Sequence, residues 1–253
     1  MDTLEHSTCG NHPLQNRPAD TLEGHPDGKY FYRAVVFDLD GTLLNTLDDL
    51  STAVNLLCRE KHWPQHSMEQ VRAMVGHGMD NLLCALSPVE LSPAEHQRTL
   101  ARLDEHYRAH CMEKTAPYPG MTELLVRLRA DGVKTAVCSN KPDEFTRRLI
   151  AHYFPGVFNE VRGHVPELPV KPDPAIVYAA LSAMGNPPQS QTLYTGDSAT
   201  DIQTGHHAGL DVCAVSWGFR GRESLEHAAP EYLADSVPEL EQILQHGRHT
   251  KAK

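Results

Sequence analysis

The chain has 253 residues, of which 40% are hydrophobic, so it can bury the core of one large domain or of two smaller ones without disulfide bonds. Its formal net charge of -10 disfavours binding to nucleic acid or to anionic lipid, because both would repel it. The 6 cysteines form no CxxC pair and no apolar run is long enough for a membrane span, which favours a cytoplasmic location.

The first part of the chain differs in composition from the rest. Residues 1–28 are rich in His, Pro, Asn, Asp and Gly without a helical or alternating apolar period, which predicts a flexible N-terminal extension of unknown role. From residue 30 to residue 38 the pattern is that of a buried parallel strand. Asp40, Gly41 and Thr42 then indicate a turn, in which Gly41 permits a sharp change of direction.

A long helical region follows this strand. Between residues 47 and 113 the apolar residues recur at helical spacing. The pattern breaks at Trp63-Pro64, at Gly76-His77-Gly78 and at Ser92-Pro93. We therefore expect several helices here.

Helices and strands alternate after the rigid segment at residues 116–120. We expect strands at 134–138, 192–195 and 212–215, and helices at 121–130, 143–152, 174–184, 200–208 and 238–244. Such alternation predicts a parallel sheet that is covered by helices on both faces.

Polar side chains follow three of these strands. They are Asp38 and Asp40 after the first strand, Ser139, Asn140 and Lys141 after the second, and Asp197 and Asp201 after the third. Because ligands bind beyond the carboxyl ends of parallel strands, we expect all of them at one rim. Clustered carboxylates need a cation, and hard oxygen ligands without a nearby Cys or His pair favour Mg2+. Ser139, the turn amides and Lys171 would hold a tetrahedral dianion beside that ion.

Each motif also has an ordinary structural explanation. Asp-Gly is common in turns, Ser139 and Asn140 could cap the helix that follows, and residues 171–174 could form a helix-capping loop. Asp197 and Asp201 could be a turn residue and an acid placed at the positive end of a helix dipole. The order and spacing of all four sets together favour the functional interpretation.

Taken together, these motifs resemble those of the haloacid dehalogenase superfamily of phosphotransferases, in the branch with a helical cap. The resemblance covers nearly all of residues 34–244 and rests on DLDGT from Asp38, SN at Ser139, KPDP from Lys171 and GDSATD from Gly196. A finer similarity, to phosphoglycolate phosphatases, rests on FDLDGTLLNTLDDL, MVGHGMDNLL, YPGMTELLVRLRADG and CSNKP.

The resemblance implies both a fold and an activity. The fold would be α/β, with a Rossmann-like parallel sheet core at residues 29–46 and 116–253 and a helical cap domain at residues 47–115, inserted after the first core strand. The activity would be Mg2+-dependent hydrolysis of a small phosphate monoester, with 2-phosphoglycolate favoured, through an aspartyl phosphate. Its partner would be this small molecule, and the chain would act as a monomer or a homodimer.

The resemblance also assigns roles to the acids. Asp38 would be the nucleophile, and Asp40 would protonate the leaving group and later deprotonate water. Asp38, the Asp40 backbone carbonyl and Asp197 would bind Mg2+, and Asp201 would orient these ligands or bind through water. Thr42 would help to fix the loop.

The same resemblance places the phosphate on three further residues. Ser139, the Asn140 amide and Lys171 would hold the phosphate oxygens, where charge develops in the transition state. The lysine matters because a carboxylate that attacks a phosphate dianion is an anion approaching another anion. Fixed positive charge makes that approach feasible at neutral pH.

The candidate substrate loop of the cap is Gly76, His77 and Gly78. Its glycines would let the backbone approach a small ligand, and His77 could donate a hydrogen bond to a carboxylate. A helix-breaking turn with an incidental histidine explains the same residues equally well. A cap that closes over the rim would exclude water from the reaction.

Other functions remain compatible with these motifs. Pyrophosphate, a glycerol phosphate or a sugar phosphate could be the substrate, or the chain could be a sugar phosphomutase. Outside the enzymes, phospho-accepting signalling modules also gather acids, a hydroxyl and a lysine at a sheet edge. Such modules are shorter and have no helical insert, so repeated release of phosphate would distinguish the two.

Overall fold

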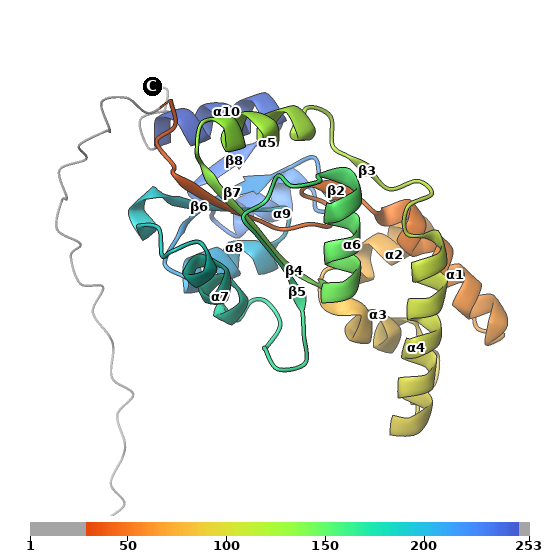
Figure 1. The fold of residues 1–253 in the computed structure, drawn as a ribbon. Helices are drawn as coiled ribbons and strands as arrows, with labels where there is room; N and C mark the ends of the chain where they lie inside the picture. The colour runs from red at the N-terminus through yellow and green to blue at the C-terminus, as the bar shows by residue number, and fades with distance from the viewer. Residues whose placement is uncertain (1–28, 248–253) are drawn as a thin grey trace, which may run out of the picture.

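The computed structural model describes residues 29–247, so the expected N-terminal extension at residues 1–28 lies outside the described residues. Within them, the main sheet has six strands in the order β5-β4-β1-β6-β7-β8 (Figure 1). All neighbouring strands of this sheet pair in parallel. The strands are β1 (Ala34–Phe37), β4 (Lys134–Pro142), β5 (Glu160–His164), β6 (Thr192–Gly196), β7 (Asp211–Val215) and β8 (Tyr232–Ala234).

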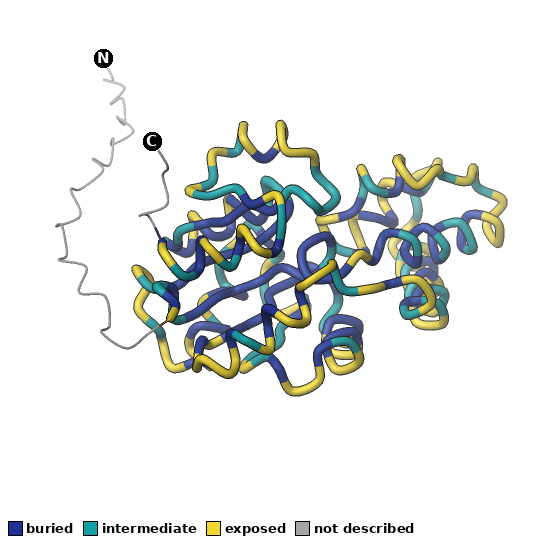
Figure 2. The backbone as a smooth tube through the Cα atoms, turned by 90° about the horizontal axis from the view of Figure 1, so that it is seen from above, coloured by how far each residue is buried: buried dark blue, intermediate teal, exposed yellow. Residues whose placement is uncertain are grey.

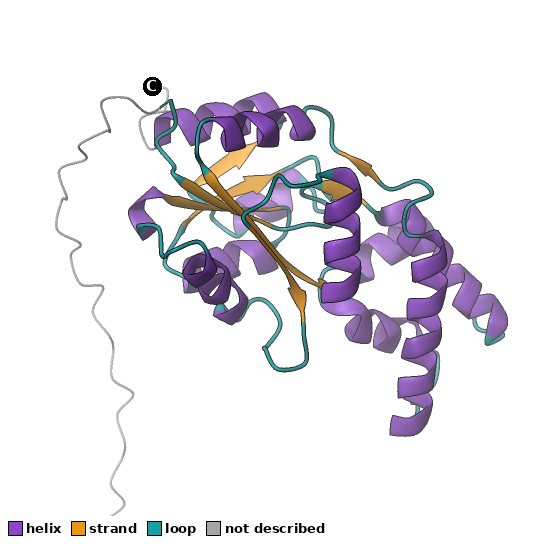
Figure 3. Ribbon diagram, viewed as in Figure 1, coloured by secondary structure: helices purple, strands orange, loops and turns teal. Residues whose placement is uncertain are grey.

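Helices cover both faces of this sheet (Figure 3). One face carries α5 (Met121–Ala130), α6 (Asp143–Tyr153) and α10 (Val237–His246), and the other carries α7 (Ala175–Ala183), α8 (Ala199–His207) and α9 (Arg222–His227). In β1, Val35 and Phe37 belong to the first apolar cluster and Val36 belongs to the second. The strand is apolar throughout because it is buried on both faces. Buried backbone accordingly runs through the middle of the molecule in Figure 2.

A group of helices, which we call the helical insert (residues 47–115), lies between two short strands, β2 (Leu44–Asn45) and β3 (Ala116–Pro117). Its helices are α1 (Leu47–Glu60), α2 (Met68–Met74), α3 (Gly78–Leu86) and α4 (Pro93–His110). Since β2 and β3 pair antiparallel, the chain leaves the α/β part and returns to it at neighbouring points. The buried apolar residues of the insert continue the cluster on the α5 face of the sheet.

The α/β fold class is confirmed, and most elements lie close to the predicted ranges. The helix expected at 121–130 matches α5, and the strand expected at 192–195 matches β6 to within one residue. β1 begins at Ala34, later than expected, because the Tyr32 backbone N–H bonds to the Leu244 carbonyl instead of a neighbouring strand. β5, β8 and α9 were not predicted, since β8 has only three residues and β5 and α9 are short and mostly polar.

The lengths of the helices and the exposure of the cysteines are two further features of the described residues. No helix within residues 29–247 combines the length and apolarity needed to cross a membrane. Among the cysteines in that range, Cys58, Cys111, Cys138 and Cys213 are buried and free, whereas Cys84 is exposed.

Candidate active site

The carboxyl ends of β1, β4 and β6 open into one pocket beneath the helical insert. The predicted residues that line it are Asp38, Asp40, Gly76, Gly78, Ser139, Asn140, Lys171, Asp197 and Asp201. The structure therefore brings together side chains from five separate stretches of sequence. This is the arrangement expected at the carboxyl edge of a parallel sheet.

Lys171 occupies the buried centre of the pocket floor. Its Nζ donates to Oδ1 of Asp38 at 2.6 Å and to Oδ1 of Asp201 at 2.7 Å, and also to the Cys138 carbonyl and the Tyr194 hydroxyl. Burial lowers the pKa of this ammonium group, but the charges of Asp201 and Asp38 outweigh burial and hold the pKa well above its ordinary value. Lys171 therefore stays charged.

Three buried carboxylates form a cluster that fits a cation. One oxygen from each of Asp38, Asp197 and Asp201 lies within 4.8 Å of the others. Burial raises the pKa of Asp38 to about 7, against the opposing charge of Lys171. Burial also raises the pKa of Asp197 well above its ordinary value, and the charges of Asp201 and Asp38 add to this. The single positive charge of Lys171 does not balance the charge of three carboxylates. The donor set consists of oxygen atoms alone, which Mg2+ prefers.

Two glycines enclose the Asp197 carboxylate. Gly41 has a φ of +85°, and a Cβ there would collide with the carboxylate of Asp197. A Cβ on Gly218, in the loop after β7, would collide with the Asp197 side chain and with the Gly41 carbonyl. The backbone N–H of Phe219 donates to Oδ2 of Asp197 at 2.6 Å. The carboxylate is therefore fixed by close backbone approach from two loops.

Both oxygens of Asp40 accept hydrogen bonds from side chains for which no role was predicted. Thr46 Oγ1 donates to Oδ1 at 2.6 Å, and Nζ of the buried Lys141 donates to Oδ2 at 2.8 Å. The Lys141 Nζ also lies 4.6 Å from the centre of the Tyr107 ring, over its face. Thr42 is buried and its hydroxyl has no partner among the described residues, while its backbone carbonyl accepts from Nε1 of Trp217 at 3.1 Å.

The side chain of Asn140 connects three segments. Its Nδ2 donates to the carbonyls of Gly76 and Lys171, and its Oδ1 accepts from the Lys171 backbone N–H at 2.7 Å. The neighbouring Ser139 Oγ accepts from the Lys141 backbone N–H at 3.2 Å, which leaves its hydroxyl hydrogen available to a ligand. The Asn140 side chain therefore holds Lys171 in place, whereas Ser139 can face a bound molecule.

Only part of the predicted substrate loop lines the pocket. Gly76 and Gly78 line the pocket, whereas His77 is exposed and is not among the residues that line it. The His77 carbonyl accepts from Nδ2 of Asn81 at 2.7 Å, so its backbone forms part of the start of α3. The insert contributes apolar side chains to the pocket from Leu50, Val75, Met79 and Leu82.

Arg220, which was not predicted as a site residue, joins the helical insert to the α/β part. It lines the pocket from the loop after β7. Its guanidinium donates to the carbonyls of Arg72 at 2.6 Å and of Val75 at 2.7 Å. These bonds hold the segment before Gly76 over the pocket. No local pattern marks such a residue, because its partners are about 145 residues distant in sequence.

The chain is similar to known proteins along most of its length. A family model described as haloacid dehalogenase-like hydrolase matches residues 35–215. A phosphoglycolate phosphatase of Aliivibrio fischeri is 31% identical over 223 residues, which is 85% of this chain and 98% of that relative. One from Thiobacillus denitrificans is 34% identical over 200 residues, 77% of this chain and 88% of that relative. The solved structure of a predicted phosphoglycolate phosphatase from Haemophilus somnus has a TM-score of 0.78 at 28% identity, and the match covers 86% of this chain and 100% of that one.

Proposed function

The chain belongs to the haloacid dehalogenase-like hydrolases, and on that basis we propose that it hydrolyses 2-phosphoglycolate to glycolate and phosphate with Mg2+. The observation that carries the proposal is the buried group formed by Asp38, Lys171, Asp197 and Asp201, which puts a potential nucleophile beside a fixed cation and further metal-ligating oxygens. The relatives named phosphoglycolate phosphatase, which match along most of their length, support this substrate class.

The metal would be held by oxygen atoms alone. Asp38, Asp197 and the backbone carbonyl of Asp40 would be its protein ligands, and Asp201 would orient them through the network around Lys171. The raised pKa values of Asp38 and Asp197 support this role, because they reflect first the burial of both carboxylates and then the charge of the neighbouring carboxylates, which a bound cation would offset. When bound, Mg2+ supplies positive charge that offsets the carboxylates facing the phosphate.

In the first step Asp38 would attack the phosphorus atom. A bond forms between an Asp38 carboxylate oxygen and phosphorus while the bond from phosphorus to the glycolate oxygen breaks. Asp40 gives its proton to the leaving oxygen, which avoids release of a free alkoxide. Lys171 and the Ser139 hydroxyl face the phosphate oxygens and stabilise the charge that builds up on them.

In the second step water would release the phosphate. Asp40, now ionised, takes a proton from a water molecule as the water oxygen bonds to phosphorus and the bond to Asp38 breaks. The products are inorganic phosphate and a restored Asp38 carboxylate, with the proton back on Asp40. Thr46 and Lys141 hold the Asp40 carboxyl group from both sides, so the same group is in position for both proton transfers.

The helical insert would select a small substrate and exclude water. Its apolar side chains at Leu50, Val75, Met79 and Leu82 face the polar floor of the pocket. Such a wall disfavours a hexose, whose hydroxyl groups would lose their hydrogen bonds to water. Of the three cations that line the pocket among the described residues, Lys141 and Lys171 pair with Asp40 and Asp38, so Arg220 would meet the carboxylate of phosphoglycolate.

Substrate turnover and labelling together test this proposal. The full-length protein is assayed with Mg2+ on 2-phosphoglycolate, glycerol phosphates, sugar phosphates and pyrophosphate, and the released phosphate is measured. We expect the highest kcat/KM with 2-phosphoglycolate. Isomerised sugar phosphate without phosphate release would instead identify a phosphomutase, and lasting phosphorylation without turnover would identify a signalling module.

A trapping experiment identifies the nucleophile itself. The enzyme is quenched during turnover of phosphate-labelled substrate, digested and analysed for the labelled peptide. We expect the label on the peptide that contains Asp38 and none in the Asp38→Asn variant, which should fold normally and be inactive. Label on another residue, or near-normal turnover by Asp38→Asn, would contradict the mechanism.

A further inference from the structure

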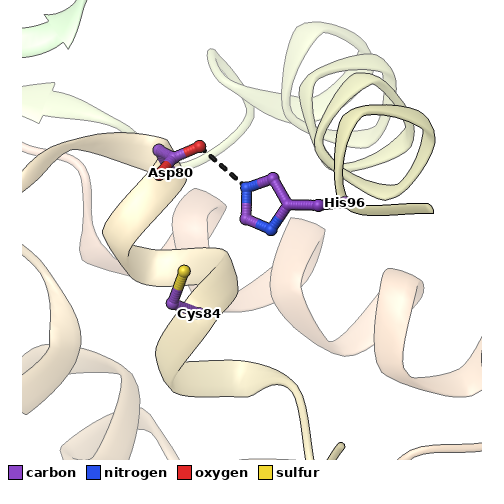
Figure 4. A group of neighbouring side chains, drawn as sticks. All are labelled: Asp80, Cys84 and His96. Atoms are coloured by element: carbon purple, nitrogen blue, oxygen red, sulfur yellow. Dashed lines mark hydrogen bonds and ion pairs between the residues drawn. The ribbon is translucent and has the colours of Figure 1, made fainter. Parts of the chain in front are cut away.

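A second group of metal-ligating side chains lies near the surface of the helical insert (Figure 4). It consists of Asp80 and Cys84 on α3 and His96 on α4. One ligand atom from each residue lies within 4.8 Å of the others. Asp80 and Cys84 are exposed, and His96 is partly buried between the two helices. None of the three lines the candidate active site.

Local structure brings the three residues together. Asp80 and Cys84 are four residues apart, so they lie on the same side of α3, one turn from each other. That side faces away from the pocket, which Met79 and Leu82 line from the opposite side of the helix. His96 lies in the first turn of α4, and Figure 4 shows its ring between the two α3 residues.

The two helices hold these side chains on a rigid support. α3 is anchored by buried residues, which are Met79, Leu82, Leu83 and Leu86. The start of α4 is fixed by a capping box between Ser92 and Glu95, and the His96 backbone N–H donates to the Ser92 carbonyl at 2.8 Å. A ligand set on packed helices needs little rearrangement on binding, so less free energy is spent on ordering it.

An ordinary ion pair explains only part of this group. His96 Nε2 lies 2.8 Å from Oδ1 of Asp80, a common surface contact that contributes little to stability. It does not account for Cys84, which is the exposed cysteine among those in residues 29–247 and which lies within reach of both partners. A thiol, an imidazole and a carboxylate together form a donor set typical of zinc sites with an open fourth position.

We propose that Asp80, Cys84 and His96 form a binding site for Zn2+ or a similar borderline-soft divalent ion. The thiolate and imidazole disfavour Mg2+, so this site and the all-oxygen cluster at the pocket floor differ in metal preference. On binding, the Cys84 thiol proton passes to solvent and the sulfur bonds to the ion. His96 binds through the lone pair of Nε2 with its proton on Nδ1, and the ion replaces the hydrogen bond to Asp80.

The bound ion would link α3 to α4. A water molecule would complete the tetrahedral coordination, because the protein offers three ligands. Since α3 also carries pocket residues on its other side, the ion would hold that helix in its packed position. Binding to the folded state alone would raise the Tm of the protein.

Metal titration of the full-length protein tests the site. Zn2+ is titrated calorimetrically in excess Mg2+, which occupies the oxygen cluster, and the number of bound equivalents is compared between wild type, Cys84→Ala and His96→Ala. The wild type and the variants share all other histidines and cysteines, so the difference in bound Zn2+ equivalents between them reports on this site alone. We expect each variant to bind one equivalent fewer than wild type.

A matched control is His106→Ala. His106 lies on the same helix and pairs with Glu60 through Nε2 at 2.9 Å, as His96 pairs with Asp80, so it tests loss of a histidine ion pair without loss of the site. This variant should keep the full number of equivalents. With Co2+ in place of Zn2+, the wild type should show a thiolate-to-cobalt charge-transfer band that Cys84→Ala lacks.

Two outcomes would overturn the proposal. One is an equal number of Zn2+ equivalents in wild type and Cys84→Ala, and the other is a loss of the same size in His106→Ala. Circular dichroism of the metal-free proteins checks that the variants fold. If His96→Ala is destabilised, Asp80→Asn serves as the second variant, and full Zn2+ binding by it would count against the site.

Discussion

The ammonium group of Lys171 lies 2.6 Å from a carboxylate oxygen of Asp38, and both side chains are buried at the floor of the pocket. A salt bridge in such a place contributes little net stability, because removing both charges from water is costly. The salt bridge matters for the reaction, at the point where the phosphate group of the substrate binds. The ammonium group is already in position and charged, so the approach of an anionic nucleophile to an anionic substrate needs no rearrangement of the protein.

Replacement of Lys171 should therefore reduce catalysis strongly. Lys171→Met is expected to cost about 3 kcal/mol of transition-state stabilisation, which is about a 150-fold loss of kcat/KM. The measurement is steady-state kinetics in saturating Mg2+. Lys134→Met is the matched control, since Lys134 lies on the same sheet and donates to the Met184 carbonyl, outside the pocket. A loss of only a few-fold in Lys171→Met would place the phosphate-binding cation elsewhere.

Lys141 should act on the position of Asp40 and not on substrate binding. Lys141→Met removes the hydrogen bond to Oδ2 of Asp40 and leaves the Thr46 bond to Oδ1, so the carboxyl group can rotate away. We expect kcat to fall by about 100-fold with little change in KM, as for loss of proton transfer. The loss should shrink for substrates with good leaving groups, which need no proton. An equal loss for all leaving groups would contradict this role.

Gly218 should determine the affinity for the metal. In Gly218→Ala the new Cβ would collide with Asp197 and with the Gly41 carbonyl, so a proposed metal ligand must shift. We expect at least a tenfold higher Mg2+ concentration for half-maximal activity, about the effect of disturbing a residue that supports a metal ligand. Gly221→Ala is the control, because a Cβ at Gly221 meets nothing within 4 Å. Equal Mg2+ dependence of the two variants would refute the prediction.

The stabilisation by Mg2+ should increase with pH. The ordinary pKa of an aspartate is 3.8, whereas burial raises the pKa of folded Asp38 to about 7. Between pH values of about 3.8 and 7 the folded state keeps a proton that the unfolded state has lost. The free energy of unfolding of the metal-free protein therefore falls as the pH rises through this range, and the fall is complete above about pH 7. Mg2+ binds the ionised carboxylate and reverses that loss.

Thermal melting measures this effect. The rise in Tm on adding Mg2+ should be small at about pH 5 and large at about pH 8, because proton and metal compete for the same carboxylate. Asp38→Asn should reduce the dependence on pH, since its amide cannot ionise. A rise in Tm that is the same at both pH values in the wild type would show that Asp38 is not a ligand.

The sequence predicted those site residues that follow strands. Asp38 and Asp197 come directly after buried strands of the sheet, and Ser139 follows the apolar run inside β4, so the general geometry of parallel sheets was enough to bring them together. The roles of these residues remain predictions. The polar strand β5 escaped detection because its residues, EVRGH, have no apolar run, and only pairing with β4 makes it a strand.

The supporting residues could not be found in this way. Thr46 reaches Asp40 from six residues further along the chain, and Arg220 reaches the insert from the loop after β7. The first contact depends on the path of the intervening turn and the second on how the insert packs on the sheet, and no periodic pattern marks either of them. Lys141 gave a partial signal, since it directly follows Ser139 and Asn140 in the sequence, but its partner Asp40 is 101 residues away.

The acceptors that Arg220 uses on the insert are backbone carbonyls, those of Arg72 and Val75. Every residue type carries such a carbonyl, so mutations at positions 72 and 75 would preserve this attachment as long as the backbone path is kept. The apolar contacts of the insert with the pocket come from side chains, so substitutions there do change them. Side chains of the insert can therefore be exchanged without loss of this attachment, as long as Arg220 and the backbone path before Gly76 are kept.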